Sequence, residues 1–210
     1  MSKTLHLPKL YAILDVTCFA PQLRTVNSIV EFARDLAEGG VTLLQYRNKE
    51  GDTRQMLAHA REIKRVLQGK VKLIMNDRAD ICVAMGYDGV HLGQDDLPAD
   101  GARLVVGERI VGVSTHNTPQ VKEADATSAD YIAIGPVFPT TGKKNPDALV
   151  GLEGVRKARA ATKKPLVAIG GITRQNAKGV IEAGADSVAV ISDQLSSPRR
   201  AAEEFLRLLV

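Results

Sequence analysis

Two neighbouring segments carry the strongest indication of the fold: Val71-Lys-Leu-Ile-Met-Asn76-Asp77-Arg78 and, after a short connection, Asp88-Gly-Val-His91-Leu-Gly-Gln94-Asp95-Asp96. They contain two apolar runs, and each run ends in a polar cluster that is rich in carboxylates. A short continuous apolar run is typical of a strand covered on both faces, as in a parallel sheet. The polar residues after each run are therefore expected at the carboxyl-terminal edge of the sheet, where Asp77 and Asp96 can approach each other.

The same order of strand and helix repeats along the rest of the chain. Apolar runs predict strands at residues 10–14, 41–47, 71–75, 89–92, 110–114, 131–135, 165–171 and 187–191. Helical spacing, caps and prolines predict helices at residues 28–38, 52–67, 79–85, 152–161, 175–183 and 198–209, with two more beginning near Pro98 and Thr118. Eight strands alternating with helices predict an α/β fold, a (β/α)8 TIM barrel that spans residues 1–210 as a single domain. A doubly wound open sheet is the alternative.

A weak internal repeat supports the barrel. Gly86-Tyr-Asp88, Ser128-Ala-Asp130 and Gly184-Ala-Asp186 each lie where a predicted helix leads into a predicted strand. We interpret the repeated unit as one β/α step. Because the three aspartates precede their strands, they belong to the amino-terminal face of the barrel, where residues serve stability. We therefore predict capping or turn-forming roles for them.

The composition restricts the partners and the location of the chain. Of its 210 residues 44% are hydrophobic, and the formal net charge is +4. Because Lys and Arg are dispersed and aromatic residues make up 4% of the chain, we expect small anionic substrates and neither a nucleic acid nor a membrane. The absence of a membrane-length apolar run and of a signal-peptide core predicts a cytoplasmic protein. A symmetric homodimer is the ordinary expectation for a small barrel.

Polar residues at the predicted strand ends form a candidate diphosphate site. Asp77 and Asp96 would suit a hard cation such as Mg2+, which takes oxygen ligands and shares phosphate oxygens. Gln45, Arg47 and Lys49 alternate along an extended segment, which aims an amide and two cations at one anion. The alternative for this segment is a solvated basic strand end with Glu50 as its partner.

A second anion site is predicted on the same rim. Gly170-Gly171 and Ser192 follow the seventh and eighth strands, where such barrels often bind a phosphate through backbone N–H groups. The long loop at residues 135–150, which includes Thr140 and Lys143, has the composition of a lid over the substrates. Plain turns and a flexible surface loop are the alternatives for these two features.

The histidines and cysteines lack the spacing of a metal site, so most of them are expected to be structural. His91 is interpreted as a packed core residue, whereas His116 could be either structural or catalytic. His59 and His6 are expected at the surface. Cys18 and Cys82 lack metal-ligand spacing, so we expect them to be reduced and buried.

Nearly the whole chain, including the candidate site residues named above, resembles the thiamine-phosphate synthase family. The resemblance rests on an ordered set of motifs: Leu44-Gln-Tyr-Arg-Asn-Lys49, Asn76-Asp-Arg, Asp88-Gly-Val-His-Leu-Gly-Gln-Asp-Asp96, Gly112-Val-Ser-Thr-His116, Gly135-Pro-Val-Phe-Pro-Thr140, Ala168-Ile-Gly-Gly-Ile172 and Val190-Ile-Ser192. It implies a transferase of thiamine biosynthesis that condenses hydroxymethylpyrimidine diphosphate with thiazole phosphate and releases diphosphate. The release would be a dissociative substitution assisted by Mg2+.

The resemblance also implies roles for individual residues. The pyrimidine diphosphate would be held by Gln45, Arg47, Lys49, Asn76, Ser114 and Lys143. Of these, Arg47, Lys49, Ser114 and Lys143 would act in catalysis, and Asp77 with Asp96 would hold the metal. The thiazole phosphate would be cradled by Thr140, Gly171, Ile191 and Ser192, with Thr141 and Gly142 of the lid nearby.

One position departs from the family pattern, and two other functions compete. The family usually has a second threonine where Gly142 stands, so Thr141 or the Gly142 N–H would replace that contact, or the chain would prefer a carboxylated thiazole. A related thiazole tautomerase would move a proton with His116 and would need neither a metal nor residues that bind diphosphate. A non-catalytic sensor of phosphorylated ligands would leave the paired carboxylates and the cations unexplained.

Overall fold

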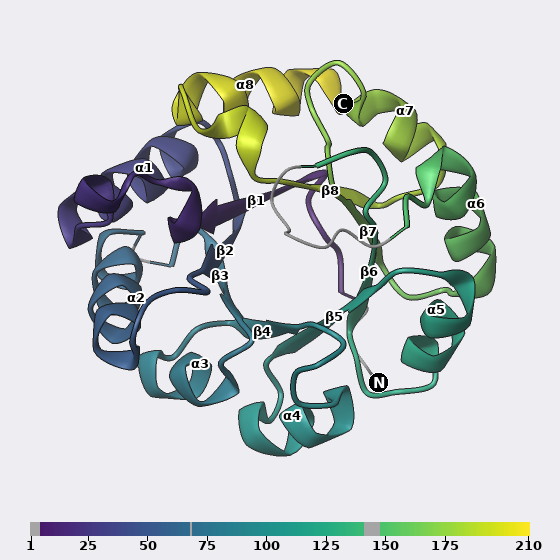
Figure 1. Ribbon diagram of the computed structural model, residues 1–210, viewed down its shortest axis with the longest axis horizontal. Helices are drawn as coiled ribbons and strands as arrows, with labels where there is room; N and C mark the ends of the chain where they lie inside the picture. The colour runs from purple at the N-terminus through teal and green to yellow at the C-terminus, as the bar shows by residue number, and fades with distance from the viewer. Residues whose placement is uncertain (1–4, 68, 141–147) are drawn as a thin grey trace.

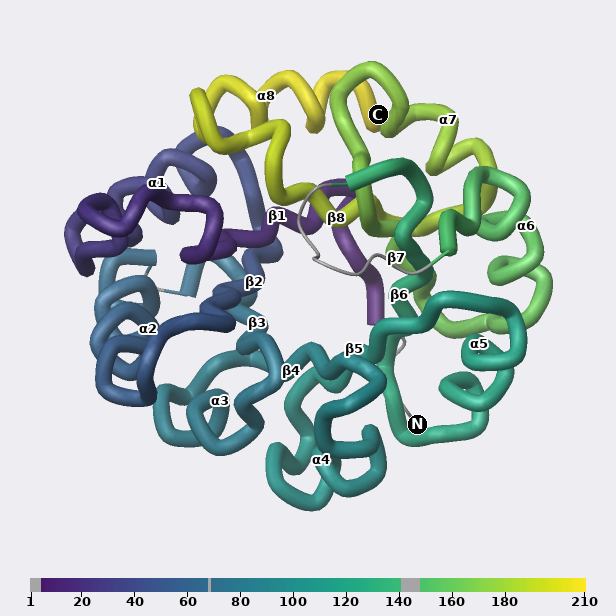
Figure 2. The backbone as a smooth tube through the Cα atoms, viewed as in Figure 1, coloured from purple at the N-terminus to yellow at the C-terminus, as the bar shows by residue number. Residues whose placement is uncertain are grey.

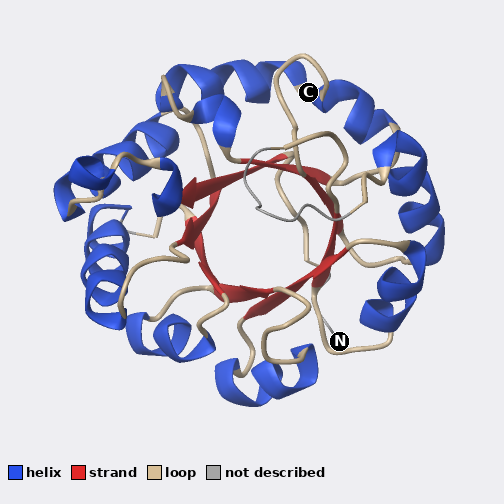
Figure 3. Ribbon diagram, in the orientation of Figure 1, coloured by secondary structure: helices blue, strands red, loops and turns tan. Residues whose placement is uncertain are grey.

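Eight parallel strands close into a ring in the computed structural model, which describes residues 5–67, 69–140 and 148–210 (Figure 3). The strands are β1 Leu10–Asp15, β2 Leu43–Arg47, β3 Lys72–Asn76, β4 Gly89–Leu92, β5 Ile110–Thr115, β6 Tyr131–Ile134, β7 Leu166–Ile169 and β8 Ser187–Val190. They pair in chain order, and β1 also pairs with β8, with Tyr11 opposite Ala189. The predicted (β/α)8 barrel is confirmed. The doubly wound alternative is wrong, because an open sheet keeps two free edges.

The helices form a layer outside this ring (Figure 1). They are α1 Val26–Glu38, α2 Thr53–Leu67, α3 Ala79–Met85, α4 Ala99–Val106, α5 Thr118–Asp125, α6 Gly151–Ala161, α7 Ala177–Glu182 and α8 Pro198–Leu208, with short 3-10 turns η1 Val16–Cys18, η2 Pro21–Leu23 and η3 Ser192–Gln194. The predicted cap Asp52 accepts the Gln55 N–H at 2.8 Å. In α1 the apolar positions Ile29, Ala33 and Leu36 are buried, so the helix covers the strands with one face.

The two faces of each strand have different neighbours. Leu10 and Ala12 belong to the core between the strands and the helices. Tyr11 and Ile13 alternate with them and belong to a second buried cluster that fills the barrel. The other buried members of this cluster are Leu43, Ile74, Tyr131, Ala133, Val167 and Ala189. The barrel is therefore filled with side chains, and a ligand can reach it at its ends.

The aspartates of the internal repeat hold the amino-terminal end of the barrel together. Asp88, Asp130 and Asp186 accept the backbone N–H groups of Leu73, Val111 and Leu166, each at 2.8 Å. Each therefore joins the start of its own strand to the preceding strand, which confirms the predicted structural role. The motif precedes β4, β6 and β8, each time where a helix leads into a strand, so it recurs at every second strand of the barrel. This spacing fits a barrel in which alternate strands present side chains at the same level.

The segment before β1 closes the amino-terminal end. Leu5 and Leu7 pack against the cluster inside the barrel, and Figure 2 shows this segment running across the ring before it enters β1. Ligands are therefore expected at the opposite end. None of the helices in the described part of the chain has the length and apolar character needed to cross a membrane.

Two sequence-based expectations are wrong. His59 is 1% exposed, and its Nδ1 lies 2.9 Å from the Tyr46 hydroxyl, because the inward face of α2 turns it toward β2. Cys18 is exposed, since it lies in the short turn that follows β1, while Cys82 is buried as expected. His6 is exposed, which confirms its predicted surface position.

Candidate active site

Three charged side chains meet at the carboxyl-terminal end of β2, β3 and β4. Asp77 directly follows β3, and Asp96 lies shortly after β4. Their carboxyl groups share a hydrogen bond, and the Lys49 ammonium forms an ion pair with Asp77. The sequence spacing therefore translates into one cluster of two acids and a base.

The backbone at Asp77 is turned sharply to present its carboxyl group. Its φ is 62°, in the left-handed region that aspartate and asparagine tolerate better than most residues. Its N–H donates to the His91 carbonyl oxygen at 2.8 Å, which ties the end of β3 to β4. The two strand ends thus fix Asp77 before any ligand arrives.

The two acids affect each other's ionisation. Burial raises the pKa of Asp77, and its hydrogen bond with Asp96 raises that pKa further against the opposing effect of Lys49. Burial also raises the pKa of Asp96, but its hydrogen bonds with Asp77 and with the Gly93 N–H at 2.7 Å outweigh burial and lower the pKa. Two carboxyl groups this close do not ionise together easily without a positive partner.

The two carboxylates fit a hard cation that needs few protein ligands. Within residues 5–67, 69–140 and 148–210, no group of three or more His, Cys, Asp or Glu side chains could surround a metal. Mg2+ needs no such group, because it is commonly held by one or two carboxylates together with waters and substrate phosphates. Asp77 and Asp96 therefore fit Mg2+, and they do not fit a structural zinc ion, which needs four protein ligands.

Of the predicted β2 residues, Gln45 and Arg47 lie on the strand and Lys49 lies beyond its end. Arg47 forms an ion pair with Asp15, which stands opposite it in the β1–β2 register. The alternative that Glu50 pairs with this basic strand end is wrong, because Glu50 pairs with Arg24 at 2.5 Å. Arg47 and Lys49 are thus held by different acids.

Asp15 is a further residue of this candidate site, and the sequence interpretation missed it. Its side chain is 5% exposed, and it also accepts the Thr17 N–H at 3.0 Å. A carboxylate directly at the end of the first strand was the available signal, since it reaches the same rim as Arg47. The role of Asp15 is to hold the Arg47 guanidinium at the mouth of the barrel.

Asn76 and Ser114 lie on the same rim. Asn76 is the last residue of β3 and is half-buried, and Ser114 lies near the end of β5. The Ser114 Oγ is 2.8 Å from the Nε2 of His91. His91 is 7% exposed, which confirms its predicted core position, and burial lowers its pKa to about 4. The imidazole is therefore neutral at pH 7.

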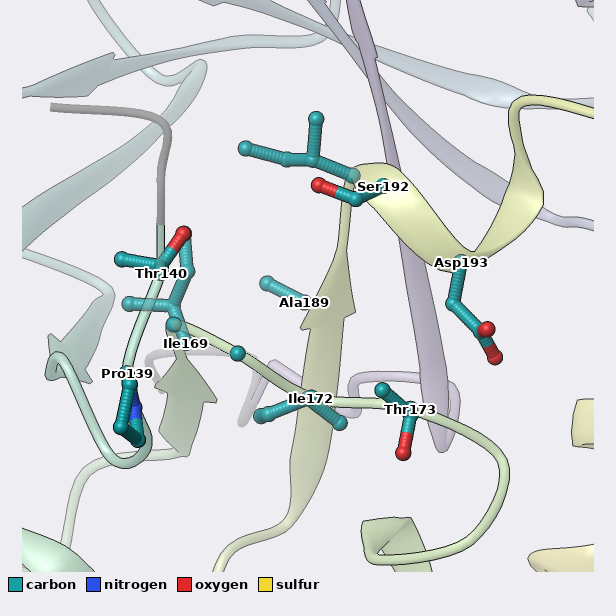
Figure 4. Close-up of a pocket in the computed structure, with 11 residues that line it drawn as sticks. Pro139, Thr140, Ile169, Ile172, Thr173, Ala189, Ser192 and Asp193 are labelled. Carbon is teal, nitrogen blue, oxygen red and sulfur yellow. The ribbon is translucent and has the colours of Figure 1, made fainter.

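A separate cavity of about 450 Å3 opens between the ends of β6, β7 and β8. The residues predicted from the family to hold a phosphate, Thr140, Gly171, Ile191 and Ser192, all line it. Figure 4 shows Thr140 and Ser192 on neighbouring walls. Asp193 also lines the cavity, but its carboxylate accepts from the backbone N–H and the Nε of Arg174, both at 2.9 Å. Ion pairing thus offsets the negative charge of Asp193.

The glycine pair shapes this cavity. Gly170 and Gly171 both have positive φ, at 99° and 62°. A Cβ on Gly171 would lie 2.5 Å from the carbonyl oxygen of Pro139, so the loop after β6 packs directly on the glycine backbone. Larger residues would push that loop away. The predicted residues Thr141, Gly142 and Lys143 lie outside the described residues.

A closed β/α barrel with a polar carboxyl-terminal rim is the architecture of a TIM-barrel enzyme. The family model for thiamine monophosphate synthase matches residues 11–193. The chain is 57% identical over 210 residues to a thiamine-phosphate synthase from Koribacter versatilis, covering 100% of this chain and 99% of that relative. It is 42% identical over 189 residues to a thiamine-phosphate synthase from Chloroflexus aurantiacus, covering 89% and 86% of the two chains.

A solved structure agrees with these relatives. Thiamine phosphate pyrophosphorylase from Pyrococcus furiosus superposes with a TM-score of 0.84 and 34% sequence identity, covering 96% of this chain and 95% of that one. This chain therefore belongs to the thiamine monophosphate synthase family. The predicted family, the predicted function as a thiamine-phosphate synthase and the enzyme class, a transferase, are confirmed.

Proposed function

We propose that the rim of this barrel joins hydroxymethylpyrimidine diphosphate to thiazole phosphate, with Mg2+ held by Asp77 and Asp96. The observation that carries the proposal is the cluster of Asp77, Asp96 and Lys49 on the same rim as the cavity beside Ser192. One location suits a metal-bound diphosphate and the other suits a monophosphate. The two substrates would therefore meet between them.

The basic residues would stabilise the leaving group. Negative charge grows on diphosphate as its carbon–oxygen bond breaks, and cations placed at that point lower the barrier. Lys49 forms an ion pair with Asp77, so its ammonium lies where it would contact an oxygen of the departing diphosphate. Arg47 is pre-positioned by Asp15, and the lid residue Lys143 would complete the set. When bound, Mg2+ would neutralise charge on the diphosphate oxygens.

The remaining predicted residues would position the reactants. Gln45, Asn76 and Ser114 would hold the pyrimidine, while Thr140, Gly171, Ile191 and Ser192 would hold the thiazole phosphate, with Thr141 and Gly142 closing over it. Anchoring both substrates makes the capture of the pyrimidine cation by the thiazole nitrogen effectively intramolecular. The protein then needs no nucleophile of its own. A carboxylated thiazole would be tested as a second substrate beside the simple form.

An assay of diphosphate release tests the proposal. The chain is incubated with both substrates and Mg2+, with each substrate alone, and with both substrates plus EDTA. We expect release only when both substrates and Mg2+ are present. Failure to release diphosphate under that condition would contradict the proposal, and proton exchange on the thiazole alone would favour the tautomerase. Release that persists in EDTA would remove the metal role of Asp77 and Asp96.

The expectations about assembly and location stay predictions. Light scattering of the purified chain at several concentrations tests for the symmetric homodimer. Fractionation of the source cells tests the cytoplasmic location.

A further inference from the structure

Five side chains form a continuous line of hydrogen bonds across the inside of the barrel. Gln45 Nε2 donates to the Tyr11 hydroxyl at 2.9 Å, and the Tyr11 and Tyr131 hydroxyls are 3.0 Å apart. The Tyr131 hydroxyl is 2.8 Å from His91 Nδ1, and His91 Nε2 is 2.8 Å from Ser114 Oγ. The line therefore connects two predicted substrate-binding residues, Gln45 on β2 and Ser114 on β5.

The interior of the barrel is built to hold this line. Tyr11 and Tyr131 are each 1% exposed and Gln45 is 2% exposed. The ring of Tyr131 stacks on His91 with centroids 5.6 Å apart. A Cβ on Gly112 would lie 1.9 Å from the Tyr131 ring, so the glycine leaves the space that this ring occupies. Buried hydroxyls without water must find their partners within the protein.

The protons in this line can be arranged in one order when the Gln45 amide nitrogen faces Tyr11. The amide donates to the Tyr11 hydroxyl. The Tyr11 hydroxyl then donates to Tyr131, and the Tyr131 hydroxyl donates to His91 Nδ1. The neutral imidazole then carries its proton on Nε2 and donates it to Ser114. The Ser114 hydroxyl proton is left for a ligand.

The opposite amide orientation reverses every bond. If the Gln45 oxygen faced Tyr11, each tyrosine would donate toward β2, and His91 would carry its proton on Nδ1. His91 Nε2 would then accept the proton of Ser114, and that hydroxyl would offer only lone pairs to a ligand. The orientation of the Gln45 amide and the donor role of Ser114 would therefore change together.

We propose that Tyr11, Tyr131 and His91 are positioning residues that transmit the orientation of the Gln45 amide to Ser114. In the orientation found here, Ser114 is a hydrogen-bond donor, which suits an anionic phosphate oxygen or a ring nitrogen. Gln45 keeps one N–H and its carbonyl oxygen, which match the donor and acceptor edge of an aminopyrimidine. Selection of that ligand rests on the proposed function, but the coupling itself does not.

The tautomer of His91 reports the coupling in the ligand-free protein. The chain has four histidines, so protein labelled with 15N-histidine gives a simple spectrum, and His91→Gln assigns the His91 signals. We expect a neutral ring with its proton on Nε2. Tyr131→Phe removes the donor to Nδ1, and Gln45→Met removes the donor at the far end. Both should mix the tautomers and move the two 15N shifts of His91 toward each other.

Tyr46→Phe is the matched control. Tyr46 bonds to His59 Nδ1 at 2.9 Å in the same way, but it lies on the outer side of β2. This variant should change the His59 signals and leave those of His91 unchanged. Tyr11→Phe replaces Tyr131→Phe if the latter does not fold. An unchanged His91 tautomer in folded Gln45→Met protein would overturn the proposal.

Kinetics provide the second readout. Tyr131→Phe should raise the KM for the pyrimidine diphosphate about tenfold, as expected for a weakened hydrogen bond to a charged group, and leave the KM for thiazole phosphate unchanged. Equal changes in both KM values would contradict a positioning role. If the wild-type chain released no diphosphate while the His91 tautomer still followed Gln45, the proposed function would fail and the coupling would stand.

Discussion

At the amino-terminal end of the barrel, Asp88, Asp130 and Asp186 each accept a backbone N–H at 2.8 Å, whereas at the carboxyl-terminal end Asp77 and Asp96 turn toward each other. The first three are satisfied by the protein itself, and Asp130 and Asp186 also pair with arginines. The second pair crowds two acids beside one lysine. The same residue type thus stabilises one end and, at the other, forms the pair that we propose binds a cation.

The largest effect is expected from Asp77→Asn, which changes one of the paired acids at the carboxyl-terminal end of the barrel. Asparagine tolerates the left-handed backbone at this position, so the variant should fold with a free energy of unfolding within about 1 kcal/mol of wild type. Turnover should fall by about a hundredfold or more, because the proposed metal ligand would then be a neutral amide in place of a carboxylate.

Turnover and urea unfolding, measured on the same samples, check this prediction. Asp80→Asn is the matched control, because Asp80 is exposed on the nearby α3 and pairs with Arg78 at 2.6 Å. It should keep wild-type turnover. Equal losses of turnover and stability in Asp77→Asn would instead show that the two ends of the barrel do not differ in the proposed way.

The next effect is a pH dependence of stability that arises from His91, which lies on β4 toward the carboxyl-terminal end of the barrel. Since burial lowers the pKa of His91 from 6.5 to about 4, the unfolded chain takes up a proton first as the pH falls. The contribution of neutral His91 to the free energy of unfolding is therefore complete above pH 6.5 and is lost as the pH falls toward 4. The loss should reach about 3 kcal/mol over that range.

Urea unfolding at pH 7, 6 and 5 checks this pH dependence. The variant His91→Gln should lose less stability over the range than wild type. His6→Gln, which changes an exposed residue, should follow the wild-type curve. Parallel curves for wild type and His91→Gln would mean that His91 does not contribute to the acid sensitivity of the carboxyl-terminal end.

A smaller effect is expected from Asp130→Ala at the amino-terminal end. It leaves the Val111 N–H and the Arg103 guanidinium without their shared acceptor, so the free energy of unfolding should fall by about 2 kcal/mol. Turnover per folded molecule should stay at the wild-type value. Chemical unfolding and a rate corrected for the folded fraction measure both quantities.

The control for this variant is Glu153→Ala on α6. Glu153 is an exposed acid that pairs with Arg156 at 3.4 Å, and its loss should change the free energy of unfolding by about 0.5 kcal/mol or less. A specific loss of turnover in folded Asp130→Ala protein would remove the contrast between the two ends.

The sequence alone was enough to predict the elements of the fold, the residues at the strand ends and the family. The alternation of apolar runs with amphipathic segments predicts eight strands and eight helices. A strand buried on both faces leaves a continuous apolar run, whereas a helix buried on one face leaves apolar residues at helical spacing. The acids after β3 and β4 were recognisable because residues that follow parallel strands must share one edge of the sheet. The ordered set of motifs also indicated the family. Some strand boundaries differ from the prediction. The strand predicted at residues 41–47 is observed as Leu43–Arg47, because hydrogen-bond pairing determines where a strand begins.

The pairing of individual side chains depended on the closed barrel and could not be predicted from the sequence. Asp15 pairs with Arg47 because closing the barrel brings β1 beside β2, and no spacing in the sequence required that choice over Glu50. His59 is buried because α2 turns that face toward Tyr46. The line from Gln45 to Ser114 joins residues of five strands, and it exists because a closed barrel forces side chains from opposite walls to share one dry interior.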